Sequence, residues 1–293
     1  MDSIKPFHLT WLPKKTFEIM VTIPWEKVSE AKKKALSQAA KSIEVKGFRK
    51  GKAPEKVVAE SLGAQKILEL TLQEIVGESY QQALSSLGLR PIISPKIELL
   101  STKENEAWQI KFTACEEPEV KLGEYKDTLK KELTGAKIWT PDKEIDPKKG
   151  ETKEDPEAKK SEKLQKALDW LIANIKVEAS DLLIDNEVSR KLSDLLDQTQ
   201  KLGLSVEQYL SSTGKTVEGI KEEYRKQVQN NLAIEFILRA IAEAEKIAVS
   251  PEEIDKAVNE AKTEEEKKAL TAQKYLLASL LRQQKTLDFL ADL

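Results

Sequence analysis

The chain has 293 residues, a net charge of −2 at pH 7, 33% charged residues and only 5% aromatic residues. This balance is typical of long amphipathic helices with large solvated faces, and the near-neutral total excludes a protein whose whole surface binds a polyanion. No run approaches the roughly 20 apolar residues of a membrane span and the N-terminus lacks the apolar core of a signal peptide, so we expect a soluble cytoplasmic protein.

The first part of the chain is predicted to be α+β. Apolar residues alternate from Phe17 to Ile23, as in a half-buried strand. Pro24 suits the first turn of a helix, and Gly63 can end one. The predicted elements, in chain order, are strands at 7–12 and 16–23, helices at 25–41, 54–62 and 64–87, and extended segments at 91–100 and 107–115.

The stretch KGFRKGKAP, residues 46–54, is predicted to form an exposed tip between two helices. From Lys27 to Lys52 there are nine Lys or Arg residues against two acids, a local charge of +7. A run of charges is usually the solvated face of a helix, but here the charge continues onto the tip, where Phe48 has no evident core to join. Cations beside one exposed aromatic residue favour a site that grips phosphates and one apolar pocket.

The middle of the chain changes character. Residues 126–163 contain 11 Lys and 10 Asp or Glu among 38 residues, and three prolines interrupt them. Apolar residues are too sparse there to form a core, so we expect a charged linker at 119–160 between a first domain at 1–118 and a second at 161–293.

The second domain is predicted to be almost entirely helical and elongated. Ser205 with Gln208 and Ser250 with Glu253 have the spacing of capping boxes. Between them an apolar residue recurs every four positions from Ile220 to Phe236. This stripe predicts a long helix from Thr216 to Ala248.

Two catalytic interpretations are weak. Residues 212–216, STGKT, end like a phosphate-binding loop, but Tyr209 stands where that motif needs glycine, and a turn with Thr216 as helix cap is the better interpretation. His8 and Cys115 are the only histidine and cysteine, which excludes a disulfide framework and a multi-cysteine metal site. No local signature joins them as a base and a nucleophile, so we interpret both as structural.

The sequence of the tip resembles the signature of a known protein family. Gly47, Phe48, Arg49, Gly51, Lys52 and Pro54 match the signature G-F-R-x-G-K-x-P of trigger factor, the bacterial ribosome-associated chaperone, at every fixed position. The stretches PEKVVAESLG and FTACEEPEVKLGEY in the first part, and LLIDNEVSRKL and GLSVEQYLSSTGKTVEGIKEEYRKQ in the second, are also similar to that family. The resemblance covers about 1–125 and 164–262.

The resemblance implies a function. It predicts an α+β ribosome-binding domain followed by an all-α elongated chaperone domain that cradles nascent or unfolded chains without ATP or any other cofactor. The implied contacts with the large ribosomal subunit, at an exit-tunnel protein and rRNA, are Gly47, Phe48, Arg49, Lys50, Gly51, Lys52 and Pro54. It also implies a weak homodimer off the ribosome and no membrane partner.

The sequence departs from the family in its middle. The family usually carries a peptidyl-prolyl isomerase domain of the FK506-binding-protein type there, and the charged segment is too short and too poor in apolar residues for one. We therefore expect no enzyme activity and no catalytic or metal site. Two alternatives stay open at this point: a folding enzyme with a disguised isomerase, and a ribosome- or rRNA-binding assembly module without chaperone activity.

Overall fold

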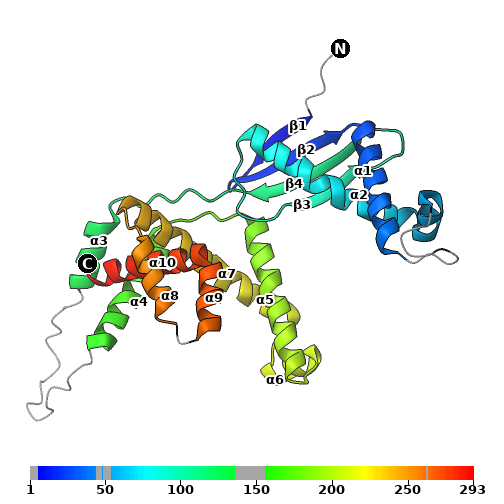
Figure 1. Cartoon of the computed structure of the whole chain (residues 1–293). Coiled ribbons are helices and arrows are strands. Elements are labelled where there is room, and N and C mark those ends of the chain that lie inside the picture. The colour runs from blue at the N-terminus through cyan, green and yellow to red at the C-terminus, as the bar shows by residue number, and fades with distance from the viewer. Residues whose placement is uncertain (1–5, 44–47, 49–53, 136–155, 262) are drawn as a thin grey trace, which may run out of the picture. The chain divides into compact units, whose positions relative to one another are not determined.

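The computed structural model describes the chain apart from residues 1–5, 44–47, 49–53, 136–155 and 262 (Figure 1). The chain divides into two compact units, one of Met1–Glu117 with Ser180–Leu183 and one of Pro118–Ala179 with Ile184–Leu293. In the described part of the chain, no helix has both the length and the apolar character to cross a membrane.

The first unit is built on a four-stranded antiparallel sheet. Its strands are β1 (Phe7–Leu12), β2 (Thr16–Ile23), β3 (Lys96–Ser101) and β4 (Trp108–Cys115), in the order β1-β2-β4-β3. The predicted strands at 7–12 and 16–23 are confirmed. The extended segment predicted at 91–100 joins the regular ladder only from Lys96, after Pro91 and Pro95, because proline cannot donate a ladder hydrogen bond. Before it, the Ile92 amide donates to the Cys115 carbonyl oxygen at 3.0 Å.

Two helices cover one face of this sheet, as Figure 1 shows: α1 (Trp25–Ser42) and α2 (Glu55–Leu87). Alternate side chains of the two central strands, from Phe17 to Ile23 and from Trp108 to Ala114, face these helices and are buried. Tyr80 of α2 stacks on Phe112 with the ring centroids 5.0 Å apart. The period of two seen in the sequence therefore marks the face of the sheet that forms the core.

Helix α2 contains the break that the sequence predicts. Gly63 has φ 75° and ψ 162°, which is not helical, and the segments on either side of it form two helices joined by a kink. These dihedral angles lie in a region that is essentially restricted to glycine. The short first segment of α2 thus takes a direction of its own.

The beginning of helix α5 belongs to the first unit. Ser180 shares a hydrogen bond of 2.8 Å with Thr16 through their hydroxyl oxygens, and Lys14 pairs with Asp181 at 2.9 Å. Lys14 and Lys15 have positive φ in the turn between β1 and β2. These contacts explain why residues 180–183 group with the sheet.

The second unit is helical. Its helices are α3 (Tyr125–Gly135), α4 (Pro156–Asn174), α5 (Asp181–Lys201, beyond its first turn), α6 (Val206–Thr213), α7 (Val217–Ala244), α8 (Pro251–Asn259), α9 (Glu264–Ala272) and α10 (Lys274–Ala291). Both predicted capping boxes are present, at Ser205 and Ser250. The predicted fold class, an α+β part followed by a helical part, is confirmed.

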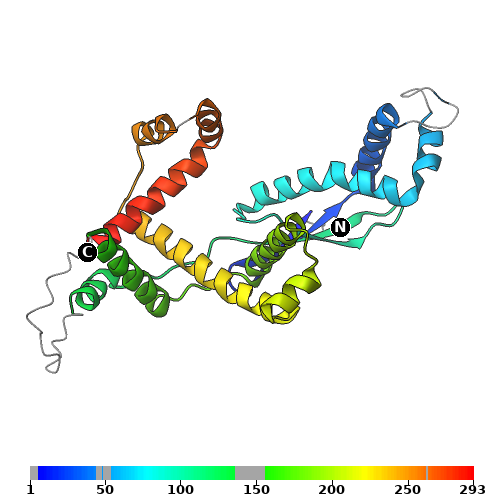
Figure 2. The same cartoon turned by 90° about the horizontal axis from the view of Figure 1, so that it is seen from below.

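The core of the second unit, which we call the base core, is formed by α3, α4, α7 and α10. Its fully buried members include Leu129 of α3, Leu171 of α4, Ile241 of α7 and Leu290 of α10. Figure 2 shows α7 and α10 leaving this region, with α6 next to the start of α7 and with α8 and α9 next to the start of α10. The ends of α7 and α10 that are remote from the base core are where side chains can stay uncovered.

The expected linker at 119–160 contains packed structure. Helix α3 lies within it, and Tyr125, Leu129 and Leu133 stand four residues apart, so that one face of α3 joins the base core. Apolar residues are few in this segment, but at helical spacing a few are enough to make one buried face. The charged stretch at 136–155 lies outside the described residues.

Helix α7 is shorter than predicted. It begins after Thr216 as expected but ends at Ala244, because Lys246 has φ 54° and the chain leaves the helical path. Arg282 and Lys285 of α10 donate to the carbonyl oxygens of Ile247 and Ala248 at 2.9 and 3.0 Å. Partners on another helix thus replace the bonds that a longer α7 would have made.

Candidate functional site

The predicted tip joins two packed helices. Ala39 of α1 and Val58 of α2 are buried against each other, with Ile43 and Leu62 packed beside them. This small cluster, separate from the main core, holds the end of α1 against the start of α2 (Figure 2). The end of α1 and the start of α2, between which the predicted tip lies in the sequence, are therefore held together by their own core.

The structure describes two of the predicted tip residues. Phe48 lies in a bend with 43% of its surface exposed, so a large apolar side chain stands in solvent as the sequence suggested. Pro54 precedes α2, and its carbonyl oxygen accepts hydrogen bonds from the amides of Val57 and Val58 at 3.0 Å. Gly47, Arg49, Lys50, Gly51 and Lys52 lie outside the described residues.

The cations of α1 are not all equivalent. Lys34 pairs with Glu74 at 2.6 Å, and this bond raises the pKa of Lys34 above its usual value. Lys32 pairs with Glu104 at 3.1 Å. Lys33 and Lys41 are exposed and pair with no described residue. Part of the charge counted in the sequence is therefore neutralised, and the open cations include one in the last turn of α1, next to the tip.

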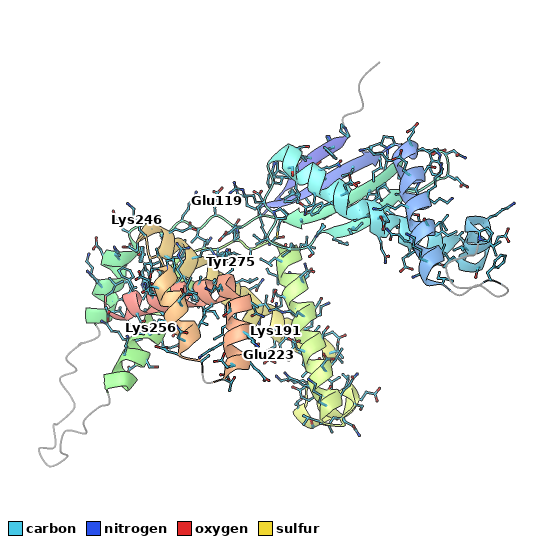
Figure 3. The ribbon with its side chains drawn as sticks, viewed as in Figure 1. Glu119, Lys191, Glu223, Lys246, Lys256 and Tyr275 are labelled. Carbon is cyan, nitrogen blue, oxygen red and sulfur yellow. The ribbon has the colours of Figure 1, made fainter. Side chains whose placement is uncertain are left out.

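A second candidate surface lies on the helices of the second unit. Around α6, exposed apolar side chains occur at Leu196, Leu202, Leu204, Val206 and Val217, and Leu202 is 75% exposed. At the start of α10, Tyr275, Leu276 and Leu280 are exposed, and Tyr275 is 91% exposed (Figure 3). We call these the α6 patch and the α10 patch.

Helix α6 and the first part of α10 contribute no buried residue near these patches, and the remaining α6-patch residues include Leu196 of α5 and Val217 of α7. Helices α6 and α9 have no buried residue, and the buried residues of α10 are confined to its last turns, from Thr286 onward. Clustered exposed apolar side chains usually mark an interaction surface. The α10 patch was not predicted from the sequence, although the stretch YLLASLL at 275–281 is apolar over more than one helical face.

The structure supports the non-catalytic interpretations. Gly214, at φ 63°, ends α6, and the Thr216 hydroxyl accepts from the Gly219 amide at the start of α7. Residues 212–216 therefore form the turn that joins α6 to α7. A phosphate-binding loop would instead follow a strand, so these residues do not form one.

His8 and Cys115 do not form a catalytic pair. His8 pairs with Met20, whereas Cys115 pairs with Thr16, four positions along β2, which corresponds to about 13 Å at the rise of a strand. Burial raises the pKa of the Cys115 thiol, which disfavours the thiolate that a nucleophile needs. Among the residues with described positions, no group of His, Cys, Asp or Glu is arranged to hold a metal ion.

Two family models match the chain. That of the bacterial trigger factor protein matches residues 8–149, and that of the trigger factor C-terminus matches residues 147–292. Together they span nearly the whole sequence and meet within the charged segment.

Individual relatives agree with the family models. Trigger factor of Carboxydothermus hydrogenoformans is 24% identical over 419 residues, which cover 96% of this chain and 97% of the relative. This aligned length exceeds the 293 residues of the chain by well over a hundred positions, which have no counterpart here. Trigger factor of Streptococcus uberis is 35% identical over 130 residues, 44% of this chain and 30% of the relative.

A solved structure has a similar fold. It belongs to a study of promiscuous substrate recognition in the folding and assembly activities of the trigger factor chaperone. The similarity covers 97% of this chain and 99% of that one, with a TM-score of 0.63 at 15% identity.

Proposed function

The chain belongs to the trigger factor family, and from this premise we propose that it is an ATP-independent chaperone that docks on the large ribosomal subunit beside the exit tunnel and shields nascent polypeptides. The observation that carries the proposal is Phe48, an exposed aromatic residue at the basic tip of a packed helical hairpin. The proposed setting is the cytoplasm, where ribosomes are.

The docking part of the proposal rests on complementary chemistry. Arg49, Lys50 and Lys52 would pair with rRNA phosphates or with a carboxylate of a ribosomal protein, and Phe48 would supply one apolar anchor. Lys41 extends the positive charge onto the last turn of α1. Gly47, Gly51 and Pro54 would shape the bend rather than make the contact.

The client-binding part rests on the α6 and α10 patches. An unfolded chain exposes apolar side chains, and their burial against Leu202, Val217, Tyr275 and Leu276 needs no nucleotide. Release of the client likewise needs no nucleotide hydrolysis, because each apolar contact is weak and reversible. We further propose that the free protein forms a weak homodimer.

We also propose that this protein lacks prolyl isomerase activity. Helices α3 and α4 join the base core, so only the 20 positions from 136 to 155 separate them. A sheet wrapped on a helix with an aromatic pocket does not fit into a segment of that length. The two family models describe the N- and C-terminal parts of trigger factor, in keeping with this proposal.

The docking proposal is tested by co-sedimentation with ribosomes. Replacing Phe48, Arg49 and Lys50 together by alanine should reduce the bound fraction at least tenfold and leave the circular dichroism spectrum unchanged, because Phe48 lies outside both clusters of the first unit. Wild-type binding should also weaken as salt rises.

A matched control removes two cations elsewhere. Lys121→Ala with Lys256→Ala makes the same change in charge at exposed positions of the second unit and should leave co-sedimentation unchanged. Undiminished binding of the tip variant would refute the assignment of this tip. Ribosome binding without any suppression of client aggregation would favour the assembly-module alternative.

A further inference from the structure

A groove of about 490 Å³ lies in the first unit at the end of the sheet where α1 begins. Its accessible apolar lining is the half-buried Phe7 with the exposed Pro24 and Ala107, and the lining also includes the buried Val21 and Ile23. This volume is within the range of about 300 to 1,000 Å³ typical of ligand sites, which are likewise mostly apolar with a few polar groups.

Among the described residues that line this groove, Lys27 is the only charged one. It is exposed, and no described residue pairs with it, whereas Lys32 and Lys34 on the same helix pair with Glu104 and Glu74. An apolar surface beside an uncompensated ammonium group is complementary to an apolar group beside an anion.

The groove continues into a second crevice between α1 and α2. The crevice has a volume of about 220 Å³ and shares Lys27, Ser79 and Gln82 with the groove. Its own lining carries Glu30, Glu78 and the ion pair of Lys34 with Glu74. Because the two acids without an ion-pair partner among the described residues outweigh the neutralised pair, a carboxylate is attracted to Lys27 at the junction and repelled farther along. Two joined compartments suit an extended segment better than a compact molecule.

We infer that this groove binds a short extended peptide segment that carries a carboxylate next to apolar side chains, with the carboxylate on Lys27 and an apolar side chain against Phe7 and Pro24. The site is separate from the tip, because Lys27 lies about 22 Å from Ser42 along α1 at 1.5 Å per residue. The inference does not rest on the proposed function, since neither ribosomes nor the α6 and α10 patches enter it.

The test uses the full chain and two fluorescently labelled, end-blocked peptides, Gly-Leu-Asp-Leu-Gly and Gly-Leu-Asn-Leu-Gly. They have nearly the same size and differ in charge. By fluorescence anisotropy the aspartate peptide should bind about two- to fivefold more tightly, the factor that an exposed charge pair supplies. Lys27→Gln should remove this preference, and Lys33→Gln, an exposed cation of the same helix outside the groove, should keep it.

A second variant tests the apolar part of the groove. Ala107→Trp places a large side chain at the exposed rim and should weaken both peptides at least fivefold without changing their ratio. Equal affinities for the two peptides, or a preference that survives Lys27→Gln, would overturn the inference. Binding seen only after deletion of residues 2–5 would assign the groove to the N-terminal segment of the chain itself and would also overturn it.

Discussion

At the scale of single residues, one polar cluster fastens α3 to the base core. The Tyr125 hydroxyl donates to Glu245 Oε1 at 2.8 Å, and Lys126 pairs with the other oxygen of the same carboxylate. The Lys126 ammonium also lies 5.3 Å from the centre of the Phe289 ring. Glu245 thus accepts from two neighbours on α3 at the point where α7 ends.

This cluster makes the docking of α3 depend on pH. The hydrogen bond from Lys126, and after it that from Tyr125, lowers the pKa of Glu245 below its ordinary value. The stabilisation is therefore present above the unfolded pKa of about 4.3 and is lost as pH falls through the lower folded pKa. We expect the hydrogen-exchange protection of α3 to be steady from pH 7 to pH 5 when corrected for the intrinsic rate, and to fall below pH 4.

The variants follow from the same contacts. Glu245→Gln should lower the free energy of unfolding of the second unit at pH 7 by about 1–2 kcal/mol, as for a lost charge-assisted hydrogen bond, and should remove most of the acid dependence. Tyr125→Phe is the matched control, because it deletes one bond but keeps the ion pair with Lys126. If the hydrogen-exchange protection of α3 depended on pH in the same way in the wild type and in Glu245→Gln, this account would be contradicted.

At the scale of elements, the direction of α2 depends on Gly63. Gly63 has a φ of 75°, and a Cβ added to it would lie in open space, since no heavy atom outside its chain neighbours comes within 4 Å of that position. The effect of a substitution here comes from the backbone alone. The segment of α2 before Gly63 contributes Val58 to the cluster that supports the tip.

Gly63→Ala should therefore destabilise the first unit by about 1–3 kcal/mol and weaken ribosome co-sedimentation through a displaced tip. Gly77→Ala is the control in the same helix. Gly77 has helical dihedral angles and equally open surroundings, so alanine there should stabilise by about 0.5–1 kcal/mol. Urea unfolding followed by circular dichroism distinguishes the two. A stabilising Gly63→Ala would show that the kink is not required.

The α10 patch allows a test of client binding. Replacing Tyr275, Leu276 and Leu280 together by serine should change the free energy of unfolding little, because these side chains are exposed. It should raise the concentration needed to suppress aggregation of a denatured client several-fold, with and without ATP. Leu290→Ala, in the base core, is the control for destabilisation alone. It should lower the free energy of unfolding by about 2–5 kcal/mol and shows how far lost stability by itself affects client binding. Full suppression by the serine variant would exclude this patch as a client surface.

At the scale of the whole molecule, one chain forms two compact units, and the helical one has a core of its own. The base core closes around α3, α4, α7 and α10. A relative of nearly full coverage has well over a hundred additional positions. The helical unit therefore has its core without them.

We accordingly expect no catalysis of proline isomerisation. The cis-to-trans rate of a proline-containing test peptide should stay at the uncatalysed value, with a time of tens to hundreds of seconds. The same protein should suppress client aggregation in a parallel assay, which shows that the sample is active. A rate increase that FK506 inhibits would show that residues 136–155 contribute an isomerase.

The sequence by itself determined the local structure of this protein and its candidate docking tip. Alternation located β2, Gly63 marked the kink, and the spacing of Ser205 and Ser250 marked two helix starts, because each of these signals depends on residues close together in the chain. The tip was found from Phe48 and its neighbouring cations for the same reason.

Only the tertiary structure decided which surfaces stay open. It showed that α3 is packed, that Lys34 is neutralised by Glu74 while Lys27 is not, and that Arg282 and Lys285 accompany the early end of α7. It also left Tyr275 in solvent on an apolar stretch that could equally have been core. Each of these outcomes depends on partners that are distant in sequence, and periodicity along one element carries no information about what lies across from it.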